Sequence, residues 1–486
     1  MATELAIDVA ILAAIFTAVI VIHLWIVGRV PTGSDPGNWL ALGRKLLGEQ
    51  AMAADVVYPP MVPSMLAALS WFVFPIKALV IVGVAARLAV GVALYVVLRP
   101  TGRATAAFGV ILALTAGYQS EIFAFGGYPQ LLATASAVLA VNALVRYLRR
   151  PQRTTLVAVL VLALLTAVTH AFSTAVLFGS AAVGVLAVLV LGQVAGGFRT
   201  VLRGILAFAP AVATFAIWLL SPSLSGEPTL NPQRFGYNEA PELLGSFVRE
   251  STWAWSLLIL GALAAIGLGL YRRRVNVPVE AMAWIISGGL IWAIFLEHRS
   301  LAFVQIGIII AVATLPSLLA AEDYSPRVAA MAFAAIAAVG LVAAVQGIQR
   351  FDETAYYYRV VDADDLWTLR AMADMSEPGD VVLSTRGRND HHLGWWIQGY
   401  AGVPTFTAAN PSYLTFPDEK QQADIALEVF RGEVGPGEFL ALAEANGIEF
   451  VVVDKRGPDA AWLATPTAQS LTPVMDWPHL AILRVP

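Results

Sequence analysis

Residues 5–27 read LAIDVAILAAIFTAVIVIHLWIV, and residues 29–39 continue as RVPTGSDPGNW. The first stretch is apolar over about 23 residues, enough for a helix to cross the roughly 30 Å hydrocarbon core of a bilayer. It is too long for the apolar region of a signal peptide, and no basic segment precedes it. We therefore interpret it as a retained membrane-spanning helix that leads into a polar loop on the outer side.

The composition of the whole chain is that of a membrane protein. Of its 486 residues, 58% are hydrophobic and 13% are charged, and the mean hydropathy is +0.71. A soluble domain carries roughly 25% charged residues, so lipid must cover most of this surface. The net charge of -4 argues against nucleic acid as a partner. The absence of cysteine excludes a disulfide framework, a thiolate nucleophile and cysteine-ligated metal.

Apolar runs recur up to about residue 347, separated by short clusters rich in Arg, Pro or Gly. Most runs are long enough to cross a bilayer, so we predict about eleven spans. The run 104–117 is short, but it contains no proline and can extend past Tyr118. The predicted spans are 5–27, 77–98, 104–117, 128–148, 154–170, 172–192, 203–220, 253–270, 281–297, 301–320 and 327–347.

One further apolar segment, 61–74, is only about 14 residues long and is too short to span comfortably. Pro59 and Pro60 precede it and Pro75 follows it. Proline cannot continue a helix from the preceding residues without losing a hydrogen bond, so these positions mark the ends of the segment. We predict a helix that lies at the outer membrane surface.

The orientation of the spans follows from two basic clusters, RYLRRPQR at 146–153 and YRRR at 271–274. Lys and Arg in short loops stay preferentially on the cytoplasmic side. The segments near 118–128, 221–252 and 298–300 are then predicted to lie outside. This places the N-terminus in the cytoplasm and the C-terminus outside the plasma membrane. The richness in Ala, Val and Arg fits a GC-rich prokaryote and a cell-envelope protein.

After about residue 350 the charges return, and strand-like apolar runs alternate with helical stretches. The predicted strands are 381–383, 450–453 and 480–483, and the predicted helices are 365–374 and 421–430. We therefore predict an α-helical polytopic membrane protein with a small C-terminal α/β soluble domain. The predicted transmembrane catalytic domain covers 1–350, and the extracytoplasmic domain covers 351–486.

Asp35 stands in the turn sequence Ser-Asp-Pro-Gly of the first outer loop, close to Trp39 and ahead of Tyr58-Pro59-Pro60. Two interpretations fit this aspartate. It can cap a helix that begins near Asn38, as Asp does in many turns. Alternatively, it is a base at the membrane–water boundary that meets a substrate whose tail stays in lipid.

This arrangement resembles the glycosyltransferase-C superfamily. The resemblance covers the layout of the whole chain: a cytoplasmic N-terminus, an Asp in the first outer loop, a surface segment, many spans and an outward C-terminal domain. Its short motifs are Asp35 and Tyr58-Pro59-Pro60. The resemblance implies an enzyme that takes a sugar from a polyprenyl-phosphate donor. The first loop has no Asp-x-Asp or Asp-Glu pair and the C-terminal region has no Trp-Trp-Asp-like motif, so no metal ligand is predicted. A divalent cation and a protein acceptor both stay open.

Two more candidate residues stand at the predicted outer edge of the membrane. Glu121 lies where enzymes of the resembled family often present a second carboxylate, near the flexible pair Gly126-Gly127. The alternative is an ordinary polar loop with a glycine hinge. His170 ends an apolar run, and an ionisable residue there suggests either a polar cavity or a plain helix cap.

The remaining candidates come from later outer segments. His298 and Arg299 follow Glu297 between two apolar runs, where Arg299 can grip a donor phosphate or simply pair with the glutamate. The long loop 221–251 contains Arg234 and Tyr237, and loops of this length are usually functional or disordered. We predict that Arg234 and Tyr237 contact substrate, as do Trp39 and Tyr58.

The predicted reaction is an inverting sugar transfer at the outer face, to a glycan, lipid or protein acceptor. Asp35 is the expected general base, and Arg299 with His298 is expected to neutralise the leaving phosphate. Glu121 and His170 are expected to orient the acceptor. Two alternatives stay open: a transporter or flippase of a lipid-linked sugar, and a non-catalytic glycan-binding membrane protein. The ionisable residues gather mostly at the outer edge rather than at mid-membrane, which favours chemistry over transport.

Overall fold

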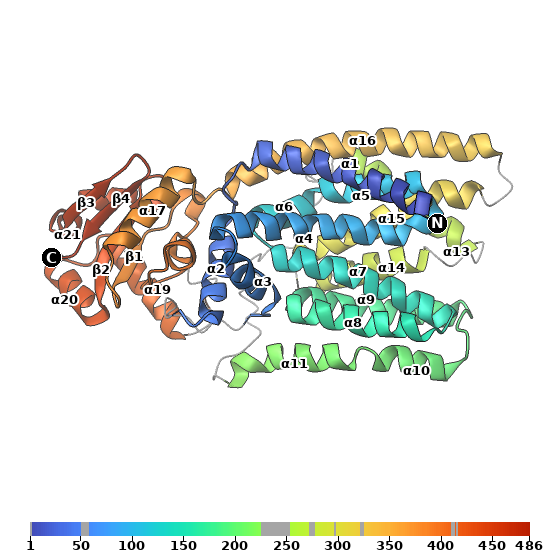
Figure 1. Ribbon diagram of the computed structural model, residues 1–486, viewed down its shortest axis with the longest axis horizontal. Coiled ribbons are helices and arrows are strands. Elements are labelled where there is room, and N and C mark those ends of the chain that lie inside the picture. Colours follow the sequence, from blue (N-terminus) through green and yellow to red (C-terminus); the bar gives the residue numbers. More distant parts are fainter. Residues whose placement is uncertain are drawn as a thin grey trace.

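A computed structural model describes residues 2–49, 58–224, 253–271, 278–295, 298–320, 325–409, 414 and 417–486. Long helices run side by side and form one elongated bundle, and a smaller domain with a β-sheet is attached at one end (Figure 1). The long helices are α1 (Ala2–Ile26), α4 (Pro75–Leu98), α7 (Tyr128–Arg149), α9 (Ala171–Val190), α13 (Trp253–Tyr271), α15 (Leu301–Ala320) and α16 (Pro326–Tyr357).

The other helices of the bundle are shorter or broken. Helices α5 (Arg103–Thr115) and α6 (Gly117–Phe125) meet at a bend of 48°. Helices α10 (Phe198–Leu206) and α11 (Ala209–Leu224) follow one another along one edge of the bundle (Figure 1). Helices α8 (Arg153–Thr169) and α14 (Pro278–Phe295) are short and apolar.

The helices of the bundle coincide with the eleven predicted apolar runs. Among the described residues, eight candidate spans are long and apolar enough to cross a membrane, or nine if the bent pair α5 and α6 counts as one. Since α8 and α14 are shorter than that limit, the total of eleven stays a prediction. The chain is an integral membrane protein with several apolar helices.

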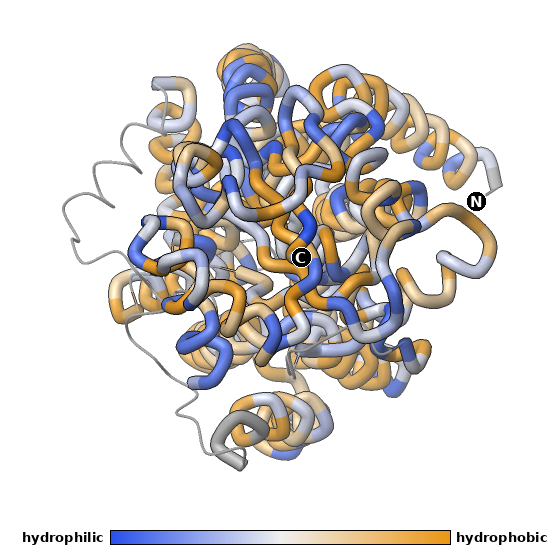
Figure 2. Tube along the Cα trace, turned by 90° about the vertical axis from the view of Figure 1, so that its left-hand side faces the viewer, coloured by the Kyte–Doolittle hydropathy of each residue, from blue (hydrophilic) through white to orange (hydrophobic). Residues whose placement is uncertain are grey.

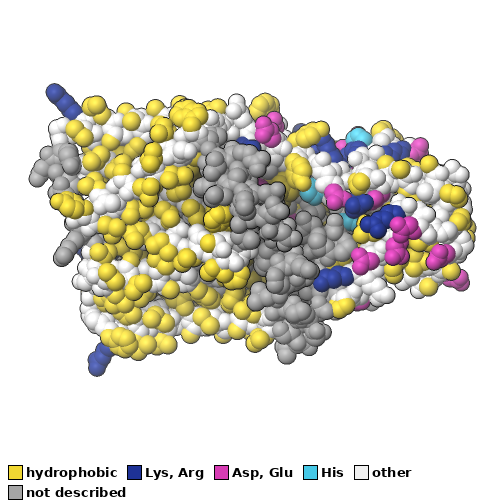
Figure 3. Space-filling model, turned by 180° about the vertical axis from the view of Figure 1, so that it is seen from behind, with side chains coloured by type: hydrophobic (Ala, Val, Ile, Leu, Met, Phe, Trp, Pro, Cys, Tyr) yellow, Lys and Arg dark blue, Asp and Glu magenta, His cyan; other side chains and the backbone are white. Residues whose placement is uncertain are grey.

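Side-chain exposure agrees with a lipid environment. Apolar side chains cover the outside of the bundle, whereas charged ones gather on the smaller domain (Figure 3). Val190, Ile217 and Met331, for instance, are 76%, 62% and 71% exposed on the bundle. In water such a surface would be unfavourable, but in hydrocarbon it has no cost.

One short segment is helical as predicted, and another differs in the structure. The segment 61–74 contains a helix, α3 (Met61–Ser70), that packs beside α2 (Asp35–Leu46) near the start of α4 (Figure 1). The outer segment 118–128, predicted as a loop, is mostly helix α6. Its helical character was missed because the segment mixes polar and aromatic residues without a long apolar run.

The smaller domain contains a four-stranded sheet in the order β1-β2-β4-β3. β1 (Val381–Ser384) is parallel to β2 (Ile448–Asp454), whereas β4 (Leu480–Arg484) is antiparallel to both β2 and β3 (Thr472–Asp476). Central strand β2 is apolar on both faces, with Phe450, Val451, Val452 and Val453 all 0% exposed. Seen end-on in Figure 2, the apolar strands lie inside a more polar rim.

Helices α17 (Ala363–Met375), α19 (Pro417–Phe430) and α20 (Pro436–Asn446) accompany the sheet. The predicted strands and helices of this region all occur, and β3 is the added edge strand. Helix α16 continues past residue 350, where the sequence suggested a domain boundary, and ends at Tyr357. The last apolar helix therefore leads directly into the smaller domain.

Candidate functional site

Asp35 is the first residue of α2, directly after the loop that follows the first apolar helix. The cap position before it is Ser34, which makes no side-chain capping hydrogen bond. The interpretation of Asp35 as the cap of a helix near Asn38 is therefore wrong. Asp35 is partly buried, and within the described residues no group donates a hydrogen bond to its carboxylate. The carboxylate is thus available to a ligand.

The loop before Asp35 is held by residues that are distant in sequence. Gly33 has a φ of +93° and its N–H donates to the Tyr358 carbonyl oxygen at 2.7 Å. The indole N–H of Trp396 donates to the Gly33 carbonyl oxygen at 2.9 Å. Trp396 belongs to α18 (Gly394–Trp396) in the smaller domain. Both domains therefore position the loop that carries Asp35.

The turn after α6 supports α2 from the other side. Gly126 has a φ of +94°, and a Cβ atom on it would lie 2.2 Å from Cδ of Pro36. The indole N–H of Trp39 donates to the Gly126 carbonyl oxygen at 2.7 Å. A side chain at Gly126 would suffer both backbone strain and a clash. The glycine pair therefore permits the close approach that its sequence suggested.

Three aromatic side chains line up beside Asp35. The rings of Trp39 and Tyr58 are 4.5 Å apart, and those of Tyr58 and His170 are 6.3 Å apart. His170 caps α9: its Nδ1 accepts from the Ser173 N–H at 3.2 Å and lies 2.9 Å from the Ser173 hydroxyl. The imidazole is thereby fixed in orientation at the start of a helix.

Arg299 adds a positive charge to this group. It lies in η3 (His298–Ser300), and its guanidinium carbon is 5.5 Å from the centre of the Phe172 ring. Its charge acts on both Asp35 and Tyr58. Asp35, Trp39, Tyr58, His170 and Arg299 therefore form one group, although they come from four separate parts of the chain.

The electrostatics of the group make the carboxylate of Asp35 a stronger base than an ordinary one. Burial raises the pKa of Asp35 to about 7, although the charge of Arg299 acts in the opposite direction. Burial, and the negative charge of Asp35, raise the pKa of Tyr58 well above its ordinary value. At neutral pH, Asp35 can accept a proton while Tyr58 remains a hydroxyl donor.

Glu121 lies on α6 and is connected to this group through Tyr358. The Tyr358 hydroxyl donates to Oε1 of Glu121 at 3.5 Å, the outer limit of a hydrogen bond. The Tyr358 ring also contacts Phe125, one turn after Glu121, with the ring centres 6.0 Å apart. Because the Tyr358 backbone holds Gly33, the same residue touches both the Asp35 loop and the Glu121 helix.

Three of the predicted site residues cannot be compared with the structure. Arg234 and Tyr237, and the side chain of His298, lie outside the described residues. Conversely, Tyr358 was not predicted as a site residue, because its hydrogen bonds to Glu121 and Gly33 join residues more than 200 positions apart. The run of aromatic residues at the end of α16 was the one signal available.

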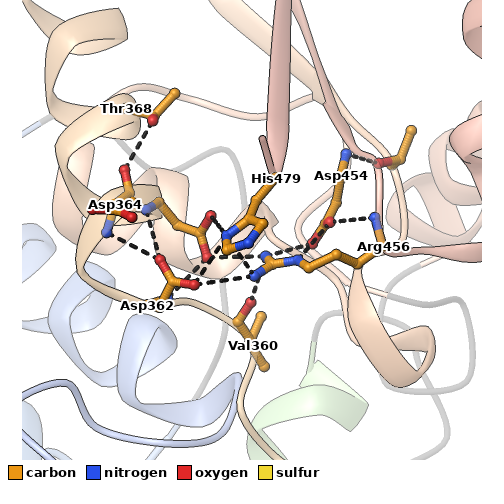
Figure 4. Close-up of polar contacts among 9 residues, drawn as sticks. Val360, Asp362, Asp364, Thr368, Asp454, Arg456 and His479 are labelled. Carbon is orange, nitrogen blue, oxygen red and sulfur yellow. Dashed lines mark hydrogen bonds and ion pairs between the residues drawn. The ribbon is translucent and has the colours of Figure 1, made fainter. Parts of the chain in front are cut away.

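A cluster in the smaller domain has the residue types of a cation site. Among the described residues, Asp362, Asp365 and His479 bring one ligand atom each within 4.8 Å of one another. However, Arg456 already reaches from Asp454 toward these carboxylates (Figure 4). Its Nη2 donates to Asp365 at 2.9 Å, and its Nη1 donates to Asp362 at 3.4 Å. The guanidinium supplies the positive charge that a cation would bring.

Comparison with solved structures identifies the fold. No protein-family model matches the chain, and no curated protein matches its sequence. ArnT from Cupriavidus metallidurans, solved with undecaprenyl phosphate, is similar with a TM-score of 0.63 and 13% identity, over 100% of this chain and 98% of that one.

Two other structures are similar. Arabinofuranosyltransferase AftD from Mycobacteria has a TM-score of 0.61 and 15% identity over 98% of this chain. The present chain spans only 41% of its length. The Archaeoglobus fulgidus oligosaccharyltransferase has a TM-score of 0.50 and 14% identity, over 93% of this chain and 71% of that one. As the layout of its sequence predicted, the chain has the glycosyltransferase-C fold.

Proposed function

We propose that the protein is a membrane glycosyltransferase that moves a sugar from a polyprenyl-phosphate donor to an acceptor at the outer face of the membrane. One observation carries the proposal: a partly buried carboxylate, Asp35, with a pKa raised to about 7, that feels the charge of Arg299 and lies on α2 with Trp39, whose ring is 4.5 Å from that of Tyr58. The fold supports it, because the similar ArnT structure was solved with undecaprenyl phosphate bound.

Asp35 is the general base of the proposed reaction. It takes the proton of an acceptor hydroxyl while that oxygen forms a bond to the anomeric carbon of the sugar. The bond between this carbon and the phosphate oxygen breaks in the same step, and the phosphate leaves with the electron pair. A single displacement of this kind inverts the anomeric configuration. A pKa near 7 suits a base that works at neutral pH.

Arg299 is the proposed partner of the leaving group. Negative charge develops on the phosphate oxygen as the bond breaks, and a fixed guanidinium stabilises it. His298, which directly precedes it, is proposed to help. Because the leaving group is already a phosphate, no strong general acid is required.

The other residues are proposed to hold the substrates. Trp39 and Tyr58 offer adjacent aromatic faces and a protonated hydroxyl for the donor. Glu121 and His170 are proposed to orient the acceptor. Arg234 and Tyr237 retain their predicted role as substrate contacts.

The orientation in the membrane is also part of the proposal. Arg99 and Arg103 lie at the end of the bundle opposite the smaller domain, where both pair with Asp8 of α1. Arg146 lies at the same end, in the last turn of α7. Basic residues favour the cytoplasmic side. The N-terminus is therefore proposed to be cytoplasmic and the smaller domain extracytoplasmic, at the plasma membrane.

The test is an assay in nanodiscs with candidate polyprenyl-phosphate sugars and acceptors, in which release of the polyprenyl phosphate is measured. Asp35→Asn keeps the size of the side chain but removes the base, and is expected to lower turnover about 10²- to 10⁴-fold. Asp374→Asn, an exposed member of an ion pair with Arg370, is the matched control and should leave turnover unchanged.

Retained turnover in Asp35→Asn would count against the assignment. A transporter or flippase would move the lipid-linked sugar between leaflets without releasing polyprenyl phosphate. A glycan-binding protein would bind acceptor and release none. The same assay therefore separates the three classes.

A further inference from the structure

The bend between α5 and α6 leaves backbone groups that need partners. Residue Ala116, between the helices, has extended backbone angles of φ −62° and ψ 135°. From its start at Arg103, α5 reaches about 20 Å into the bundle before the bend, at 1.5 Å per residue. The last carbonyl groups of a helix have no partner within that helix, and inside a membrane water does not replace it.

Side chains supply the missing partners. The Thr115 hydroxyl donates to the carbonyl oxygens of Ile111 at 2.8 Å and Leu112 at 3.4 Å. Closer to the bend, the Leu114 carbonyl accepts from Nη2 of Arg87 at 2.6 Å. The same nitrogen donates to the Ser120 hydroxyl at 3.2 Å. One guanidinium therefore connects the end of α5 with the first turn of α6.

Arg87 is a buried cation with aromatic neighbours. It lies in the middle of α4 and is 6% exposed. Its guanidinium carbon lies over the rings of Phe351 at 4.5 Å and Phe123 at 5.2 Å. In the described chain no carboxylate pairs with it. A buried charge in a membrane helix is costly and usually has a specific function, and here Nη2 of Arg87 donates to both groups at the bend.

Helix α16 also fits closely against the bend. A Cβ atom on Gly347 would lie 1.8 Å from the Thr115 carbonyl oxygen, so only glycine allows this approach. Three turns later, α16 ends and Tyr358 reaches Glu121. Helix α6 is thus held at its start by Arg87 and at its end by the Gly126 turn on α2. Glu121, the residue after Ser120, lies between these two supports.

We propose that Arg87 is a positioning residue for Glu121: by binding the Leu114 carbonyl and the Ser120 hydroxyl, it fixes the direction of α6 and so the place where Glu121 meets the acceptor. This rests on the proposed function, in which Glu121 orients the acceptor. The donor side of the site, formed by Arg299, Tyr58 and Trp39, includes one bond to the turn after α6, from Trp39 to the Gly126 carbonyl, at the opposite end of α6 from Arg87.

The test compares three variants in nanodiscs. Arg87→Met removes both hydrogen bonds, Arg87→Lys keeps a charge and a single donor group, and Ser120→Ala removes one acceptor. Ser180→Ala is the matched control, because it removes a buried serine hydroxyl that pairs with Ser287 away from α6. The KM values for acceptor and donor are measured separately, together with hydrogen exchange of the amides at 117–127.

A displaced α6 should raise the acceptor KM about tenfold in Arg87→Met and about threefold in Ser120→Ala, because catalytic geometry is sensitive to displacements of about 1 Å. The donor KM should stay within about twofold of wild type. Arg87→Lys should recover part of the loss. The double variant Arg87→Met/Ser120→Ala should have the same acceptor KM as Arg87→Met alone. Exchange at 117–127 should become faster in the Arg87 and Ser120 variants and not in Ser180→Ala.

Two outcomes would overturn the inference. One is an unchanged acceptor KM with unchanged exchange at 117–127 in Ser120→Ala, which is the test that remains if Arg87→Met does not fold. The other is an equal rise of both KM values, which indicates a disturbance of the whole site and not of α6 alone. If the wild-type protein transfers no sugar, the proposed function fails, whereas the hydrogen-exchange measurement still decides whether Arg87 holds α6.

Discussion

The clusters around Arg456 and around Arg299 both combine an arginine with aspartate, and they differ in how many hydrogen bonds the carboxylates receive. In the smaller domain, Arg456 donates to both oxygens of Asp454 at 2.9 Å. Asp362 accepts from the N–H groups of Asp364 and Asp365, each at 3.0 Å. Near the membrane, Asp35 has Arg299 as its electrostatic partner but no hydrogen bond from the described residues.

The difference separates a structural cluster from a candidate reactive site. A carboxylate that accepts several hydrogen bonds is stabilised as an anion and is a poor base. Accordingly, backbone hydrogen bonds and the charges of His479 and Arg456 outweigh burial and lower the pKa of Asp362, although burial raises the pKa of the neighbouring Asp365. For Asp35 burial prevails, and the pKa rises to about 7. The same residue types therefore hold the sheet together in one place and remain available for proton transfer in the other.

The largest expected effect concerns stability. Arg456→Met leaves Asp454 and Asp365, whose side chains are 0% and 1% exposed, without their cation. Breaking a buried ion pair in this way costs about 3–5 kcal/mol. Hydrogen exchange of the β2 and β4 amides in the full chain measures this loss. Arg370→Met, which breaks an exposed pair, should cost less than about 1 kcal/mol. Unchanged exchange in β2 would show that the cluster is dispensable.

The second effect concerns catalysis and the charge of Arg299. Arg299→Gln removes the charge but keeps a polar side chain, and is expected to lower kcat/KM about 10²-fold because the leaving phosphate loses its stabilising partner. Since Arg299 also lowers the pKa of Asp35, the acid limb of the pH–rate profile should move to higher pH. Arg327→Gln, at an exposed position at the start of α16, serves as the control. A profile that does not move would show that the charge of Arg299 does not act on the pKa of Asp35.

The third effect is the pH dependence of the wild-type enzyme. Only the deprotonated form of Asp35 can act as a base, so the rate should rise with pH up to a plateau above about pH 7. At pH 6 it should fall to about a tenth of the plateau, as for a single group titrating one unit above. A flat profile between pH 5 and 7 would contradict the base assignment.

Raising the pH through about 7 should increase the activity of the protein but lower the stability of its fold. The pKa of Asp35 is raised from 3.8 to about 7 in the folded protein, so ionisation of Asp35 destabilises the fold as the pH rises through this range. Asp35→Asn should therefore raise the unfolding temperature at pH 8 and have little effect at pH 4. A thermal unfolding series at the two pH values measures the difference.

Much of the fold could be predicted from the sequence because the membrane makes one-dimensional hydropathy decisive. In hydrocarbon the backbone must satisfy its own hydrogen bonds, so an apolar run of sufficient length is a helix. The bend at Ala116 could not be predicted in this way. Its supports, Arg87 and Gly347, are 27 and more than 200 positions from the carbonyl groups they contact.

In the smaller domain, the edge strand β3 could not be predicted from the sequence pattern either. The predicted strands are buried and rich in Val, Ile and Leu, whereas β3 is mostly exposed and contains Pro473. Such an edge strand has neither the alternation nor the apolar density that marks a strand. In the candidate site, Asp35 and Arg299 attracted attention as charges beside apolar runs. Tyr358 did not, because its importance depends on which helices meet at the end of α16.

Tyr358→Phe is expected to have the smallest effect. The variant keeps the ring that contacts Phe125 and the backbone carbonyl that holds Gly33, and removes only the hydroxyl. Because that hydroxyl is 3.5 Å from Glu121, its loss should change the acceptor KM only about twofold to fivefold. Tyr357→Phe, an exposed neighbour, is the matched control. A loss as large as that in Arg299→Gln would mean that Tyr358 contacts the substrate itself. No change would mean that Arg87 and the Gly126 turn position Glu121 without help from the Tyr358 hydroxyl.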